Sequence, residues 1–275
     1  MAVVLLGAVL HAGWNAIVRA SKDKFHDTYL IVIGAAAWAL PLVPFLSLPA
    51  VESWPFLIAS MIIHIAYFSL VALAYRGGEL SFVYPVMRGC ASAMSAIAAV
   101  IFLHESLTGG GWTGVALISC GIFALAGDSL RTGTFRTRPA AFALANAGVI
   151  VVYTLVDGQG ARLSGSAISY TAWILLLTCA PMLAWSLATG RRAAFERLRL
   201  GWRRGLVGGG CTLASYALAL WAMTRAPIAL VAALRETSVV FGAIIAAAFL
   251  KEPVTRLRYA SIFTVSAGAI AMKLF

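Results

Sequence analysis

Charged side chains are scarce in this 275-residue chain and make up only 11% of it. Soluble domains contain about 25% charged and about 45–50% apolar residues, whereas 61% of this chain is hydrophobic and its mean hydropathy is +0.91. This composition excludes a cytosolic enzyme, a secreted disulfide scaffold and a disordered chain. It predicts an all-α polytopic membrane protein, a multi-pass protein of the cell membrane, with a bacterial inner membrane as the expected location.

Acidic residues are the scarcer charged class, with 10 Asp and Glu against 21 Lys and Arg, so the formal net charge is +11. The basic residues lie mostly in loops between apolar runs, where they set orientation and contact anionic lipid headgroups. We therefore expect the lipid bilayer, and no nucleic acid, as a partner. One side of the membrane would hold only Arg162, Arg225 and Lys273, so the positive-inside rule predicts that both termini lie outside the cell.

Cysteine is rare as well, and all four cysteines fall inside apolar runs without CxxC spacing: Cys90, Cys120, Cys179 and Cys211. They are typical of small buried hydrophobic residues rather than of a disulfide or metal set. The four histidines are spread over separate segments and a loop. The sequence therefore predicts no metal site and no cofactor.

The chain instead has long apolar runs, each close to the roughly 20 residues that a membrane-spanning helix needs. Their lengths leave only short loops and no room for a soluble domain. We expect ten transmembrane helices, at about 2–19, 27–48, 54–75, 81–103, 109–127, 139–157, 166–188, 203–224, 228–250 and 256–274.

An internal repeat relates the two halves of the chain. Residues 82–108 align with residues 229–255, so that Arg88 falls on Arg235 and Glu105 on Glu252. A five-helix unit is odd-numbered, so its second copy enters the membrane from the opposite side. The sequence predicts two inverted five-helix repeats, residues 1–130 and 131–275, an arrangement in which transporters place substrate near the midplane between the halves.

Three ionisable residues lie deep in the predicted helices: Arg88, Arg235 and Glu236. A charge in hydrocarbon costs roughly 2.5–3.5 kcal/mol on insertion scales, so such residues face a cavity or a partner. The functional interpretation is an anionic group bound between the two arginines, with Glu236 as a proton carrier or as the partner of an amine. The alternative is structural, with each arginine permanently paired, and Glu236 as the counter-charge of an arginine on another helix.

Other polar and aromatic residues extend the candidate site. His11, Trp14 and Asn15 cluster in the first helix, where they line a polar cavity or form interhelical hydrogen bonds. Tyr67, Tyr84 and Tyr153 are candidate aromatic walls, as are His64, Tyr216 and Trp221, although each alone is also typical of packing or of the interface belt. Asp157 is expected at the membrane interface, with proton coupling as the alternative. Glu105 and Glu252 are expected to brace loops.

Several stretches resemble EamA-type transporters of the drug/metabolite transporter superfamily, and the resemblance covers essentially the whole chain. They are "LHAGWNAIVRAS" in the first helix, "YPVMRG" in the fourth, and "TRAPIALVAALRETSVVFGAIIAAAFLKE" across the eighth and ninth. The resemblance implies ten helices in two inverted repeats, a central cavity, no ATPase domain, and coupling to an ion gradient or exchange. The matching positions are Arg88, Arg235 and Glu236, to which the family assigns no single agreed role. Such transporters are commonly drawn with both termini in the cytoplasm, contrary to the loop charges here.

Together these observations predict a secondary active transporter, not an enzyme. We expect it to export or exchange a small organic metabolite with an anionic group, such as an amino acid, organic acid or phosphonate, as a monomer or homodimer. The alternatives are a multidrug cation exporter and a flippase of an anionic lipid headgroup. Small cation exporters depend on a glutamate in the first helix, which this chain lacks.

Overall fold

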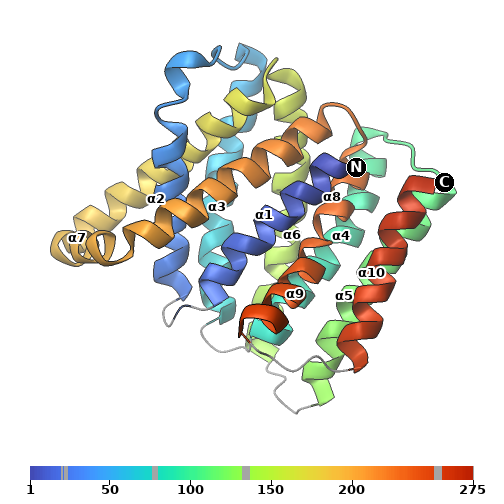
Figure 1. The fold of residues 1–275 in the computed structure, drawn as a ribbon. Coiled ribbons are helices and arrows are strands. Elements are labelled where there is room, and N and C mark those ends of the chain that lie inside the picture. The colour runs from blue at the N-terminus through green and yellow to red at the C-terminus, as the bar shows by residue number, and fades with distance from the viewer. Residues whose placement is uncertain (20, 22–23, 76–79, 132–136, 251–255, 275) are drawn as a thin grey trace.

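The computed structural model of the chain is a bundle of helices and describes residues 1–19, 21, 24–75, 80–131, 137–250 and 256–274 (Figure 1). These residues form α-helices and two short 3-10 turns, η1 and η2, and contain no strand. In chain order the elements are α1 (Ala2–Arg19), α2 (Lys24–Ala39), η1 (Val43–Phe45), η2 (Val51–Ser53), α3 (Trp54–Tyr75), α4 (Leu80–Leu103), α5 (Gly109–Arg131), α6 (Thr137–Leu163), α7 (Ala167–Met223), α8 (Ile228–Arg235), α9 (Ser238–Leu250) and α10 (Arg256–Leu274).

The predicted class, an all-α polytopic membrane protein, is confirmed. Five stretches of the described residues are helical, long and apolar enough to cross a membrane: His26–Phe45, Val51–Val71, Thr137–Leu163, Ala167–Ala188 and Leu198–Met223. Four shorter apolar helices accompany them: Ala2–Val18, Met87–Leu103, Gly109–Ala124 and Tyr259–Met272. The number of spans, expected to be ten, stays a prediction.

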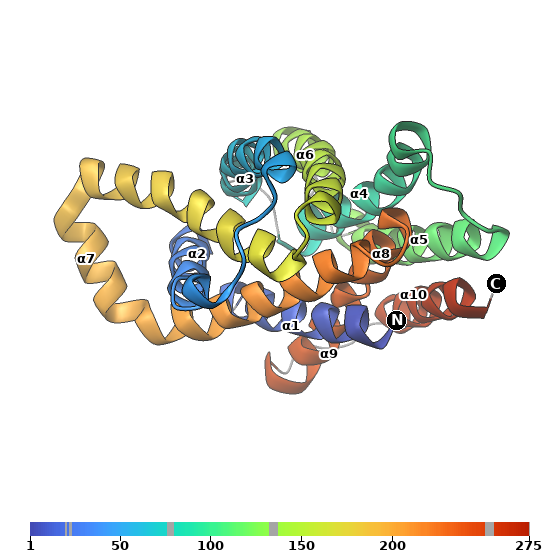
Figure 2. The same ribbon diagram turned by 90° about the horizontal axis from the view of Figure 1, so that it is seen from above.

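The predicted seventh and eighth helices belong to one continuous helix, α7, of 57 residues. Figure 2 shows α7 leaving the bundle, curving round and returning to it, so that its two arms occupy the two predicted positions. The segment between the arms, residues 189–202, has no proline and contains four Arg, two Ala, two Leu and one Glu, which are strong helix formers. The connection therefore stays helical where a loop was expected.

The predicted ninth helix, by contrast, is broken into α8 and α9. At the break the bonds tighten from i→i−4 to i→i−3, since Glu236 N donates to Ala233 O and Thr237 N donates to Leu234 O. The Thr237 hydroxyl also donates to Leu234 O, at 2.6 Å, which is how threonine competes with the regular helical ladder. The break places two adjacent charged residues, Arg235 and Glu236, in the interior of the bundle.

Close helix contact fixes the second arm of α7 against α2. Gly205 and Gly209 face Leu30 and Gly34, and a Cβ added at Gly209 would overlap the backbone of Gly34 and Ala35. Small residues at such crossings let backbones approach, as is common in membrane helices. This contact holds the α7 tyrosine Tyr216 in place beside the centre of the bundle.

Candidate functional site

A central cavity of about 90 Å³ lies among helices from both predicted halves. Its lining comes from α1 (His11, Trp14), α2 (Thr28, Ile31, Val32), α3 (His64, Tyr67, Phe68), α6 (Tyr153), α7 (Ile174, Leu175, Thr178, Thr212, Ser215, Tyr216) and α8 (Arg235). Arg235 is the one permanently charged side chain among these described lining residues.

Arg235 is the last residue of α8 and is only 7% exposed. Its guanidinium carbon lies 5.3 Å from the centroid of the Tyr216 ring, in a cation–π contact. Within the described residues the guanidinium has no ion pair and no hydrogen bond. Arg235 therefore presents to the cavity a positive charge that has no described ion-pair partner.

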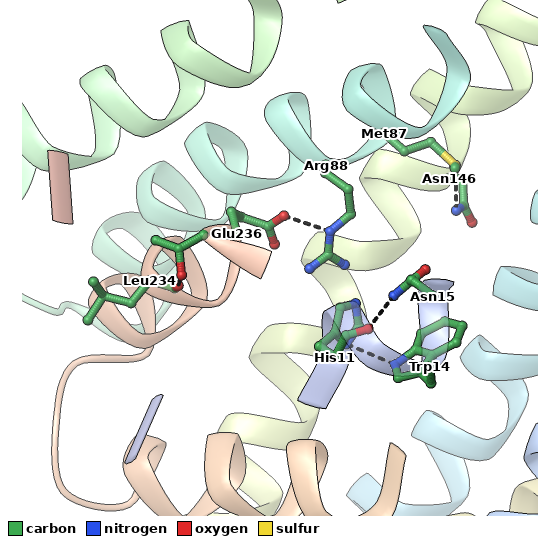
Figure 3. Close-up of polar contacts among 9 residues, drawn as sticks. His11, Trp14, Asn15, Met87, Arg88, Asn146, Leu234 and Glu236 are labelled. Carbon is green, nitrogen blue, oxygen red and sulfur yellow. Dashed lines mark hydrogen bonds and ion pairs between the residues drawn. The ribbon is translucent and has the colours of Figure 1, made fainter. Parts of the chain in front are cut away.

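The second arginine is engaged differently. Arg88, on α4, donates from Nε to Glu236 Oε2 at 2.6 Å, and the two residues are 3% and 4% exposed (Figure 3). Glu236 follows Arg235 directly in the chain, and adjacent helical residues point about 100° apart. The side chains of Arg235 and Glu236 therefore point in different directions. This contact between Glu236 and Arg88 is of the kind expected from the structural alternative, in which Glu236 is the counter-charge of an arginine on another helix.

Arg88 and Arg235 also line different cavities. Arg88 borders a second, adjoining cavity of about 30 Å³, together with Asn15, Met87 and Asn146. The two cavities share Trp14, Thr28, Tyr67 and Phe68. The two arginines therefore line adjoining cavities, one on each, and the binding of one anion between them stays a prediction.

The cluster on α1 lies between these cavities. His11 and Trp14 line the central cavity, and Trp14 and Asn15 line the second. Trp14 Nε1 donates to His11 Nδ1 at 3.2 Å, and Asn15 Nδ2 donates to the His11 carbonyl at 2.8 Å (Figure 3). Because Nδ1 accepts a hydrogen bond it carries no proton, so His11 is the neutral imidazole in this arrangement.

An aromatic wall closes another side of the central cavity. The His64 ring lies 4.9 Å from the Tyr153 ring and 6.3 Å from the Tyr67 ring, and Tyr67 and Tyr153 are 5.7 Å apart, all measured between centroids. Tyr67 also lies 5.1 Å from Phe68. Three of the four candidate tyrosines, Tyr67, Tyr153 and Tyr216, thus line the cavity. The side chain of the fourth, Tyr84, lies outside the described residues.

Asp157 is fully buried within the protein, and its expected depth at the membrane interface stays a prediction. The Tyr170 hydroxyl donates to its Oδ1 at 3.2 Å, and the Tyr216 hydroxyl donates to its Oδ2. Ser60 lies near the same carboxyl group. These residues come from α3 and both arms of α7, and the long range over which they meet explains why the chain position of Asp157 gave no sign of its burial.

His64 connects this buried carboxyl group to the cavity. Its Nδ1 lies 2.9 Å from the Ser60 carbonyl oxygen and 3.0 Å from the Ser60 hydroxyl. With a proton on Nδ1, His64 donates to Ser60, and in the other tautomer Nδ1 accepts from the Ser60 hydroxyl. In either case Ser60 lies between His64 and Asp157. Sequence reasoning missed the roles of Ser60 and Tyr170; tyrosines inside apolar runs were the only available signal.

One end of the bundle is held by Glu105, as the loop-bracing expectation proposed. Its carboxylate accepts from the backbone N–H groups of Ile228 and Ala229, the first residues of α8, at 2.9 and 3.2 Å. It also pairs with Arg162 Nη2 at 2.7 Å, and Arg162 Nε donates to the Met223 carbonyl near the end of α7. Glu105 and Arg162 thus satisfy a helix start and a helix end together. Glu252 lies outside the described residues.

Comparison with known proteins gives one family match. Residues 138–274 match the EamA-like transporter family. Chains of solved structures match as well, 28 in number. One of them, titled only "Crystal structure of protein", is 16% identical with a TM-score of 0.75 over 100% of this chain and 99% of its own, and so shows a shared fold. Among curated proteins, none matches this chain.

Proposed function

We propose that the chain is a secondary active transporter of a small organic metabolite with an anionic group. Its EamA-like transporter domain makes it a membrane transporter of the drug/metabolite transporter superfamily. The observation that carries the proposal is Arg235, a buried guanidinium that lines the central cavity without a described counter-ion. Holding an unpaired charge in the interior costs several kcal/mol. A carboxylate or phosphonate bound in the cavity would offset that cost through a charge-assisted, bidentate contact.

The packing supports alternating access between two inverted halves, 1–130 and 131–275. The predicted repeat exchanges each helix of the first half with its counterpart in the second half. Under this exchange the pair α5–α10 and the pair α4–α8 are each unchanged, while the pair α3–α6 becomes the pair formed by α1 and the second arm of α7. The helices of each of these pairs are in contact. The interrupted helix α8–α9 lies at the central cavity, where discontinuous helices hold substrate in many secondary transporters.

Asp157 is our candidate for proton coupling, in preference to Glu236. Glu236 is engaged by Arg88, whereas the groups facing Asp157 are Tyr170, Tyr216, Ser60 and, beyond Ser60, His64. Arg235 lies across the ring of Tyr216, whose hydroxyl contacts Asp157. An anion bound at Arg235 would place a second negative charge on this side of the cavity, which would favour the protonated form of Asp157.

The cation-exporter alternative fits the cavity less well. No acidic side chain occurs among the described lining residues of either cavity. A lipophilic cation would meet Arg235 and have no carboxylate to pair with. Transport of an anionic lipid headgroup would use the same arginine, so it enters as an outcome of the test.

The test is a thermal-shift screen of the purified protein with organic anions, lipophilic cations and short-chain anionic lipids. Bound ligand at about 100 times its Kd stabilises the folded state by about 2.7 kcal/mol. We expect organic anions to raise the Tm of the wild type and of Arg225→Ala, an exposed arginine that stacks on Trp221, but not of Arg235→Ala. Stabilisation by anions that survives in Arg235→Ala, or hits among cations alone, would refute the proposal. Hits restricted to anionic lipids would refute the metabolite and favour the flippase.

A further inference from the structure

We infer that the substrate is a monocarboxylate with an apolar or aromatic body, and that it carries neither an ammonium group nor a second negative charge. This inference rests on the proposed function and narrows it. It follows from what the central cavity offers to each part of a ligand: one cation, an aromatic and aliphatic wall, a few hydroxyl groups, and no carboxylate among the described lining residues.

The charge available to an anion is a single guanidinium. Arg88 would be the second cation, but it is paired with Glu236 at 2.6 Å and borders the adjoining cavity. Phosphate groups and dicarboxylates carry close to two charges at neutral pH and are usually held by several cationic groups. Arg235 alone matches one carboxylate, which its planar fork can bind through two parallel hydrogen bonds.

An ammonium group would have no partner of opposite charge. Asp157 is fully buried behind the hydroxyls of Tyr170 and Tyr216, and Glu236 is held by Arg88. The ammonium of an amino acid lies within one carbon of its carboxylate, so it would be desolvated close to the Arg235 guanidinium, where like charges repel. Of the groups the cavity offers, only aromatic faces attract a cation, and Tyr216, the face nearest to Arg235, is already used by it.

The rest of the cavity suits an apolar body. His64, Tyr67, Phe68 and Tyr153 form a continuous ring surface, and aliphatic side chains complete the lining: Ile31, Val32, Ile174 and Leu175. One of the hydroxyls, that of Thr212, already donates to the Gly208 carbonyl at 2.9 Å. A polyhydroxylated body such as a sugar acid would leave most of its hydroxyls unpaired in this lining, at the cost of their desolvation.

A matched ligand series tests the inference on wild-type protein. 3-Phenylpropanoate carries the carboxylate and the ring; phenylalanine adds the ammonium; 2-phenylethylphosphonate adds charge; propanoate removes the ring; and phenethylamine replaces the carboxylate by an ammonium. Binding is measured by calorimetry in detergent. We expect 3-phenylpropanoate to bind at least about tenfold more tightly than each of the other four, which corresponds to about 1.4 kcal/mol.

The outcomes separate this inference from the proposed function. Equal or tighter binding of phenylalanine, of the phosphonate or of propanoate would overturn the inference and leave an anion transporter. Binding of phenethylamine alone, or binding of 3-phenylpropanoate that is unchanged in Arg235→Ala, would overturn both. Arg235→Lys keeps the charge and loses the planar fork, so weakened but measurable 3-phenylpropanoate binding by this variant would support the inference even if Arg235→Ala fails to fold.

Discussion

Removing either partner of the buried pair Arg88–Glu236 is expected to destabilise the protein far more than removing both. The two side chains are 4% and 6% exposed, and their contact joins α4 to the break between α8 and α9. Arg88→Met leaves the Glu236 carboxylate without this partner, and Glu236→Gln removes the charge that faces Arg88. Breaking a buried pair on one side costs about 3–5 kcal/mol.

The double variant Arg88→Met/Glu236→Gln leaves no uncompensated charge at this position. Replacing a whole buried pair by neutral groups is often neutral or stabilising, so we expect the double variant to be more stable than either single variant. The coupling energy from the double-mutant cycle would be several kcal/mol, well above the 0.5 kcal/mol or so at which independent sites are still additive.

The control is a pair that lies at the surface. Arg204 Nη1 contacts Asp27 Oδ2 at 3.1 Å, and the Arg204 side chain is 59% exposed. Solvent screens such a pair, so Arg204→Met is expected to cost no more than about 1 kcal/mol.

Thermal unfolding in detergent, followed with a thiol-reactive dye, is a suitable assay because the chain has four free cysteines, of which Cys179 is buried. A loss of 3–5 kcal/mol corresponds to a Tm drop on the order of 10 °C. If Arg88→Met costs no more than Arg204→Met, or if the two single effects add up in the double variant, Arg88 and Glu236 are not an energetically coupled pair and the reasoning fails.

Three further outcomes are expected. Gly209→Ala should destabilise the protein by about 1–3 kcal/mol and so lower the Tm, because the new Cβ would overlap the α2 backbone. Gly148→Ala in α6, which has open space around it, should leave the Tm unchanged. Equal effects of the two substitutions would contradict the close α2–α7 contact. Glu105→Ala should cost about 1–3 kcal/mol, since it leaves two N–H groups at the start of α8 unpaired, and a Tm within error of the wild type would speak against this cap. Asp157→Asn should bind the substrate yet lose transport driven by a pH gradient in proteoliposomes, and a variant that keeps full pH-driven flux would remove Asp157 from coupling.

The sequence was enough for the class of fold and for many of the residues at the cavity, because both depend on local properties. An apolar run of membrane-spanning length predicts a helix whatever surrounds it, and a polar residue inside such a run must avoid lipid. For this reason His11, Trp14 and Arg235 could be proposed from chain position alone, and the structure places all three on the central cavity.

What the sequence did not reveal depends on contacts between distant residues. The partner of Arg88 lies 148 positions away, and the phenols that bury Asp157 come from both arms of α7. The break after Arg235 could not be predicted either, since residues 228–250 are apolar enough for an unbroken helix and the interruption depends on i→i−3 bonds and one threonine hydroxyl.

The break in the predicted ninth helix explains how a strongly basic chain can have a nearly neutral interior. Had residues 228–250 formed one straight helix, Arg235 and Glu236 would still diverge, but the tightened turn lets Glu236 neutralise Arg88 while Arg235 stays beside Tyr216. With Asp157 ionised, the two arginines and two carboxylates cancel; with a monocarboxylate bound and Asp157 protonated, they cancel again. Both states carry the same net interior charge, so the exchange of a proton for the substrate anion would build up no net charge in a low-dielectric region. A dianion would break that balance, which is a reason independent of cavity shape for the substrate to carry a single negative charge.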